Sequence, residues 1–141
     1  MAKETLAGLF ALMHAAESAR THLESKLDAV NLSHAKLSAL QALYESDDSI
    51  PLTELAARLS CVKSNVTQLV DRLEADGFVR REGDPKDRRT RLAVMTASGR
   101  KAYEHGARIH DQAVDEMFSG LSTSESRQLK ALIEKLKTPR Q

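Results

Sequence analysis

The short segment GDPKDRRT, at residues 83–90, carries the side chains that could do the most chemistry. Five of its residues are charged, and they are Asp84, Lys86, Asp87, Arg88 and Arg89. Gly-Asp-Pro favours a turn, so the segment is predicted to be exposed. Exposed cations can contact phosphate or enter a narrow minor groove of DNA. Asp87 could pair with Arg89 and fix its direction. The alternative is a solvated hairpin tip of mixed charge.

A second group of polar side chains is predicted on one face of a helix over 63–76. The opposite face is apolar, with Val66, Leu69, Val70 and Leu73 at helical spacing. The polar residues that could contact DNA are Lys63, Ser64, Asn65, Thr67, Gln68 and Arg72. Gln and Asn can form bidentate hydrogen bonds to adenine, and Ser or Thr can bond to several bases. Lys63 and the free N–H groups of the first turn can hold phosphate. An ordinary solvated face is the alternative, because every amphipathic helix has one.

The elements around these residues form a pattern of their own. Apolar stripes predict a short helix at 52–59, followed by a three-residue turn and the helix 63–76. Gly77 suits a left-handed C-cap. Strand-like runs at 78–82 and 91–96 flank the charged turn. Two helices followed by a β-hairpin with a cationic tip are the layout of a winged helix-turn-helix, so double-stranded DNA is the expected partner.

The rest of the chain is predicted to be helical. Helical spacing indicates one helix over 4–29 and a second that follows a Ser33 cap, and a Thr96 cap predicts a third over 97–118. A last helix begins at the capping box STSE, which ends at Glu125. The fold class is therefore mostly α with a small β-hairpin wing. The apolar stripes of 4–29 and 121–137 lie outside the winged part and need a surface to cover them.

Composition limits the remaining possibilities. The 141 residues carry a net charge of only +1 and 4% aromatic residues. Residues 51–100 hold ten Lys or Arg against seven Asp or Glu, so positive charge gathers around the hairpin. The single cysteine excludes an intramolecular disulfide and a cysteine-rich zinc site. No long apolar run predicts a membrane span or a signal peptide, and we expect a cytoplasmic protein without a cofactor.

The helix-turn-helix and the wing together resemble the MarR family of transcriptional regulators. The resemblance rests on LTELAARLSCVKSNVTQLVDRLEADGFVRR (52–81) and GDPKDRRTRLAVMTASGR (83–100). The second stretch is similar to the family's wing signature at Asp84, Asp87, Arg88, Arg89, Thr96 and Gly99. Two positions depart from the family pattern. Lys86 stands where Arg is common. Val62 stands where Ser or Thr usually caps the helix 63–76, which is called the reading helix below.

The resemblance implies a domain organisation and partners. The chain would be a single MarR-type domain over 1–141, with a winged helix-turn-helix part at 33–100 and helical dimerisation parts at 1–30 and 101–141. It implies a homodimer that binds a palindromic operator, mostly as a repressor, and that responds to a small-molecule or redox effector. The effector site would lie between the dimer helices and the winged part. From their positions, His14 and His34 are candidates to border that cleft.

Two further hypotheses concern the switch. Cys61 precedes the reading helix, where nearby Lys63 and a helix N-terminus could lower its pKa and make it redox-active; a small buried residue is the alternative. The five histidines include no His-x3-His pair, and His105 and His110 do not share a helix face, so no metal site is predicted.

Two other classes of function fit the sequence less well. A winged-helix module for protein interaction without DNA binding should lack wing cations and carry an apolar reading helix, unlike this chain. An enzyme is not expected, because no catalytic triad order, metal-spaced cluster or glycine-rich phosphate loop appears.

Overall fold

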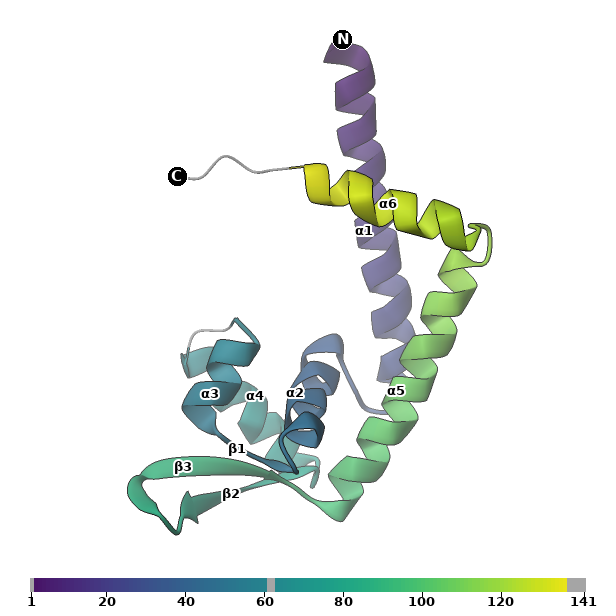
Figure 1. Ribbon diagram of the computed structural model, residues 1–141. Coiled ribbons are helices and arrows are strands. Elements are labelled where there is room, and N and C mark those ends of the chain that lie inside the picture. The colour runs from purple at the N-terminus through teal and green to yellow at the C-terminus, as the bar shows by residue number, and fades with distance from the viewer. Residues whose placement is uncertain (1, 61–62, 137–141) are drawn as a thin grey trace.

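A computed structural model of the chain describes residues 2–60 and 63–136. Over these residues it has six helices and one small antiparallel sheet (Figure 1). In chain order the elements are α1 (Ala2–Asp28), α2 (His34–Glu45), β1 (Ser49–Pro51), α3 (Leu52–Arg58), α4 (Lys63–Ala75), β2 (Val79–Asp84), β3 (Asp87–Met95), α5 (Ala97–Phe118) and α6 (Thr123–Lys135). The strand order is β1-β3-β2. The predicted fold class is confirmed.

The sheet differs from the sequence-based prediction in two ways. Residues 49–51, predicted only to be extended, form a third strand in which Ile50 lies opposite Ala93. The predicted turn over 83–90 is wrong, because β2 runs to Asp84 and β3 starts at Asp87, so that the hairpin closes over two residues. These strand ends could not be recognised in the sequence. Both faces of the ribbon are largely exposed there, so its residues do not alternate between apolar and polar.

The core lies where α2, α3 and α4 meet the sheet. Its most deeply buried side chains are Leu27, Leu40, Leu43, Ile50, Leu55, Val66, Val70, Leu73 and Val79. The apolar stripes predicted for the two helix-turn-helix helices therefore face inward, as expected. Leu27 comes from the last turn of α1 and is completely buried, so α1 belongs to this core at its C-terminal end.

The predicted helix caps are present. The Ser33 side chain accepts a hydrogen bond from the Lys36 N–H at 3.1 Å. Ser122 and Glu125 form a full capping box, and the hydrogen bond from the Ser122 N–H lowers the pKa of the Glu125 carboxyl. The Thr96 side chain accepts from the Gly99 N–H at 3.0 Å and donates to the Gly77 carbonyl at 2.7 Å. Thr96 thus joins the start of α5 to the end of the reading helix.

Gly99 allows α5 to begin directly against the turn before β2. A Cβ atom built at this position would lie 2.0 Å from the Phe78 carbonyl oxygen. No side chain can occupy that space without moving the backbone, so the glycine is required by close packing. This explains one residue of the wing signature in physical terms.

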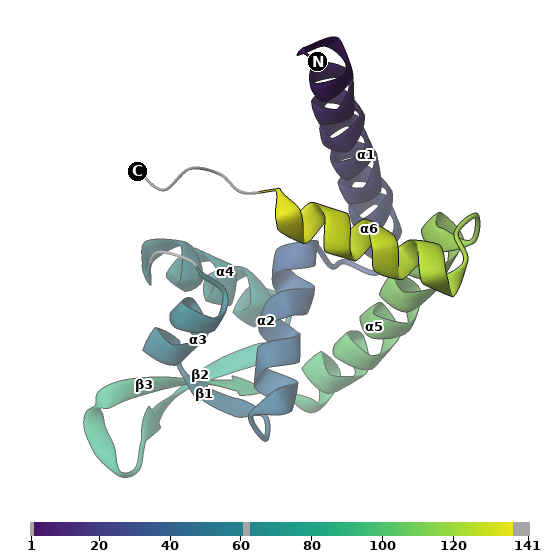
Figure 2. The same ribbon diagram turned by 45° about the horizontal axis from the view of Figure 1, so that its top comes forward.

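The molecule has two ends. In Figures 1 and 2 the β2–β3 hairpin projects at one end, while the N-terminal half of α1 extends away from the core at the other, beside α6. Large apolar side chains are exposed on these two helices and at the C-cap of α6, among them Leu6, Leu9, Phe10, Met13, Leu129, Leu132, Ile133 and Leu136. Together α1 and α6 line an apolar cleft of about 1010 Å³. None of the helices over residues 2–60 and 63–136 is long and apolar enough to cross a membrane.

Candidate nucleic-acid interface

The α4 helix presents a polar face to solvent. Val66, Val70 and Leu73 fix its opposite face in the core. The predicted contact residues Asn65, Thr67, Gln68 and Arg72 are all exposed. Lys63 and Ser64 lie in the first turn of α4, but the structure does not describe their side chains. The candidate redox residue Cys61 lies outside the described residues.

The wing presents three unpaired cations beyond the core. The side chains of Lys86, Arg88 and Arg89 are exposed, and none forms an ion pair within the described residues. Asp84 Oδ1 accepts a hydrogen bond from the Lys86 N–H at 2.9 Å. Asp87 Oδ1 accepts from the Arg89 N–H at 3.0 Å, and Asp87 Oδ2 from the Thr90 hydroxyl at 3.0 Å. The aspartates therefore shape the backbone of the tip and leave its cations free.

The expected pairing of Asp87 with the Arg89 guanidinium is not the contact that the structure shows. Asp87 holds the backbone of Arg89 instead, because an aspartate readily bonds the N–H two residues further on. It can still orient the wing, but through main-chain geometry.

Arg81 is a residue of this region that the sequence reading missed. It lies on β2 opposite Ala93 and on the same strand face as buried Val79. Its guanidinium donates to Glu74 Oε1 at 3.0 Å, to Asp71 Oδ1 at 2.6 Å and to the Thr67 carbonyl at 3.1 Å. An arginine at an inward position of a strand is a signal that carboxylates must lie nearby.

Two other charged groups anchor the ends of this unit. Asp76, just after α4, accepts hydrogen bonds from Lys36 Nζ at 2.8 Å and Asn31 Nδ2 at 3.2 Å. Arg100 of α5 donates to both carboxylate oxygens of Asp48, which raises the pKa of its guanidinium, and it lies over the Tyr44 ring. These contacts join the end of α4 to α2 and to the segment between α1 and α2, and they join α5 to α2 and to the segment between α2 and β1.

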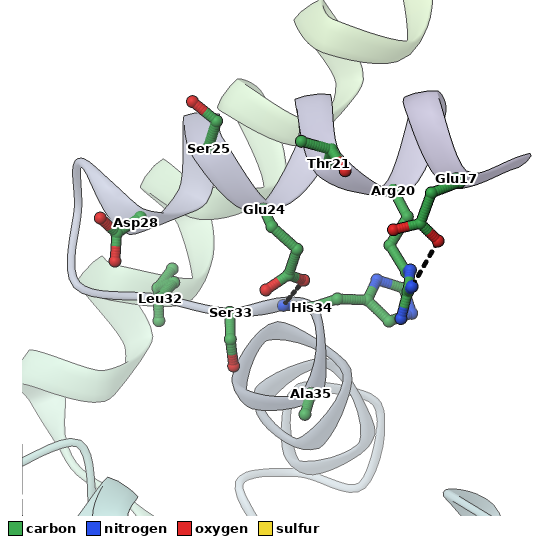
Figure 3. A pocket seen from close by; sticks show the side chains of 10 residues that line it. All are labelled: Glu17, Arg20, Thr21, Glu24, Ser25, Asp28, Leu32, Ser33, His34 and Ala35. Atoms are coloured by element: carbon green, nitrogen blue, oxygen red, sulfur yellow. Dashed lines mark hydrogen bonds and ion pairs between the residues drawn. The ribbon is translucent and has the colours of Figure 1, made fainter. Parts of the chain in front are cut away.

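The histidines predicted to border one effector cleft lie in different clefts. His34 lines an open cleft of about 730 Å³ between α1 and the start of α2, where Glu24 accepts a hydrogen bond from the His34 N–H (Figure 3). Arg20 and Glu17, which also line this cleft, form an ion pair. His14 lies with His22 in a separate cleft of about 610 Å³ that reaches α5 and α6.

His34 also lines a smaller cavity of about 250 Å³ between α2 and α5, together with Tyr103, His110 and Asp111. Burial there raises the pKa of Tyr103. Among residues 2–60 and 63–136, no group of three or more His, Cys, Asp or Glu could hold a metal ion.

The fold and the exposed groups define a winged helix-turn-helix protein. Residues 32–90 match the model of the MarR family. The chain belongs to this family, and the similar proteins named below are transcriptional regulators.

Three relatives illustrate the similarity. The HTH-type regulator YkoM of Bacillus subtilis is 37% identical over 71% of this chain, and the match spans 64% of YkoM. The regulator MhqR of the same organism is 27% identical over 89% of this chain and 86% of its own length. The structure of Sco3205 from Streptomyces coelicolor, a MarR family regulator in complex with DNA, is 29% identical, with a TM-score of 0.84 over 95% of this chain and 85% of Sco3205.

Proposed function

We propose that this protein is a homodimeric, sequence-specific DNA-binding regulator, which acts as a repressor on a palindromic operator. One observation carries the proposal: an exposed polar helix face and an exposed cationic hairpin belong to the same winged domain. The DNA complex of Sco3205 supports it, because that protein has the same fold over most of this chain.

The two exposed surfaces suit different parts of DNA. Asn65 and Gln68 on α4 carry amides that can read base edges in a major groove, while Arg72 can neutralise phosphate. The free cations of the wing suit an adjacent minor groove, whose negative potential attracts arginine. Lys63 and Ser64 at the helix start are proposed to contact phosphate and bases.

A second copy of the chain is proposed to cover the apolar surface of α1 and α6. Phe10 is 61% exposed and Leu132 is also 61% exposed, which is unusual for large apolar side chains on so small a protein. Burial of this surface across a two-fold axis would place two α4 helices on one side of the DNA. Their half-sites should then lie about 10 bp apart, centre to centre.

The effector is proposed to be a small organic molecule that binds in the cleft between α1 and α2. His34 and Glu24 supply polar groups there, and Leu32 supplies an apolar one (Figure 3). The same cleft touches the 31–36 segment, which contacts Asp76 at the end of α4. A molecule that moves this segment would therefore shift the reading helix.

Selection of binding sites from random DNA tests the proposal without knowledge of the target gene. The selected sequences should share a palindrome with the half-site spacing given above. Recovery of no enriched sequence by the folded protein would contradict sequence-specific binding and favour a protein-interaction module. Repeating the binding measurement with an oxidant tests the hypothesis that Cys61 is redox-active.

Arg89→Ala should weaken binding to the selected operator by roughly fivefold or more, since a phosphate or groove contact is lost. Fluorescence anisotropy at moderate salt measures this. Arg127→Ala, which removes an exposed arginine from α6, is the matched control and should leave the affinity unchanged. Equal affinities of the two variants would show that the wing tip does not contact DNA.

A further inference from the structure

Above its apolar base, the wing hairpin is hydrogen-bonded to the reading helix through Arg81. Within the described residues, the side-chain hydrogen bonds between the two wing strands and α4 all involve Arg81. Its side chain is only 18% exposed, although its partners Asp71 and Glu74 are 60% and 44% exposed. The largely buried guanidinium of Arg81 thus bonds to groups on two successive turns of α4.

The contacts of Arg81 restrict both position and angle. Three acceptors surround the planar guanidinium, and the Arg81 N–H donates to Glu74 Oε2 at 3.2 Å. Glu74 therefore receives both a main-chain and a side-chain hydrogen bond from one wing residue. A guanidinium can satisfy several fixed acceptors at once, whereas a lysine ammonium cannot reproduce the planar fork.

The apolar core fixes only the base of the wing. Val79 and Met95 are buried, but from Arg80 onward β2 has no buried residue, and neither has β3 before Ala93. The tip carries its free cations at the far end of this ribbon (Figure 1). A small rotation at the base would move the tip cations away from the groove that α4 enters.

We propose that Arg81 is a positioning residue that sets the angle between the wing and α4, so that both reach one DNA half-site together. The inference rests on the proposed DNA binding but does not require Arg81 to touch DNA. It assigns Asp71, Glu74 and the Thr67 carbonyl to the same task. The tip arginines can then contribute fully only when Arg81 is in place.

Arg80 offers a matched control on the same strand. It points to the opposite strand face and pairs with Glu82 of its own strand, so it makes no described contact with α4. Arg81→Lys and Arg80→Lys both keep the charge. Arg81→Lys should weaken operator binding about tenfold, because the fork is lost, and Arg80→Lys less than about twofold.

A double-mutant cycle with Arg89→Ala separates positioning from direct contact. If Arg81 positions the wing, Arg89→Ala should cost several-fold in the natural background but less than about twofold when Arg81→Lys is already present. Glu74→Gln, which removes the charge and one of the two acceptor oxygens on the helix side, should show the same coupling and guards against a poorly folded Arg81 variant. Independent, additive losses in both backgrounds would overturn the proposal.

Hydrogen exchange in the absence of DNA makes the inference independent of the proposed function. The amides of residues 83–91 should exchange several-fold faster in Arg81→Lys than in the natural protein, and at the natural rate in Arg80→Lys. If exchange rises while the natural protein selects no DNA sequence, the anchor is correct and the proposed function fails. Unchanged exchange in Arg81→Lys would overturn the anchor itself.

Discussion

At the scale of single residues, the charged side chains of the wing divide into two groups. Asp84 and Asp87 bond to main-chain N–H groups nearby, and Arg81 bonds to the helix. Lys86 and Arg89 remain available to a partner. Sequence reasoning predicted the exposed cations correctly, because a polar hairpin tip is easy to recognise. It missed Arg81, since the partners of Arg81 lie on another element and no spacing rule links them.

Gly99→Ala should destabilise the fold by about 2–4 kcal/mol, because the new Cβ would clash with the Phe78 carbonyl. Denaturant unfolding measures the loss. Gly83→Ala is the control, since nothing lies within 4 Å of a Cβ at that position and its φ is not positive. A Gly99→Ala protein as stable as the Gly83→Ala protein would show that the backbone yields at little cost.

At the scale of elements, the helices were predictable and the sheet was less so. Repeating apolar spacing and a capping residue mark α2, α5 and α6 in the sequence, and the structure confirms each cap. The strand β1 has only three residues, and its pairing with β3 depends on contacts distant in sequence. The wing strands also continue past Gly83 with an irregular register, and no local sequence pattern predicts this continuation.

The α4 helix should supply base discrimination. Gln68→Ala is expected to reduce the preference for the natural base at one position of each half-site, at a cost of about 1–3 kcal/mol in discrimination. Competition between the selected operator and single-base variants measures the preference. Arg72→Ala serves as a comparison that should weaken all sequences alike. A uniform loss with Gln68→Ala would mean that this side chain contacts only the backbone of the DNA.

At the scale of the whole molecule, α1 belongs to two surfaces at once. Its last turn places Leu27 in the winged core, whereas its N-terminal half exposes Leu9 and Phe10. The sequence could not separate these roles, because the apolar stripe of α1 looks the same along its length. Removal of residues 1–30 would therefore damage the core as well as the proposed dimer, so point substitutions are the better test.

Leu9→Glu combined with Leu132→Glu should weaken the proposed dimer at least about a hundredfold, since an unpaired carboxylate is costly to bury. Sedimentation or light scattering measures the state of assembly. Lys130→Glu, on an exposed position of α6 outside the apolar cleft, is the control. A charged double variant that remains a dimer at low concentration would place the interface elsewhere.

The continuity of α1 has a consequence for how assembly and DNA reading are coupled. The helix runs without a break from Ala2 to Asp28, so its two surfaces keep a fixed angular phase. Each residue of an α-helix advances the chain by about 1.5 Å and turns it by about 100°. One residue inserted near Ser18 would swing Leu9 and Phe10 to another side of the rod. In the proposed dimer, the helical phase of α1 would thus help to determine which half-site separation the two subunits can span.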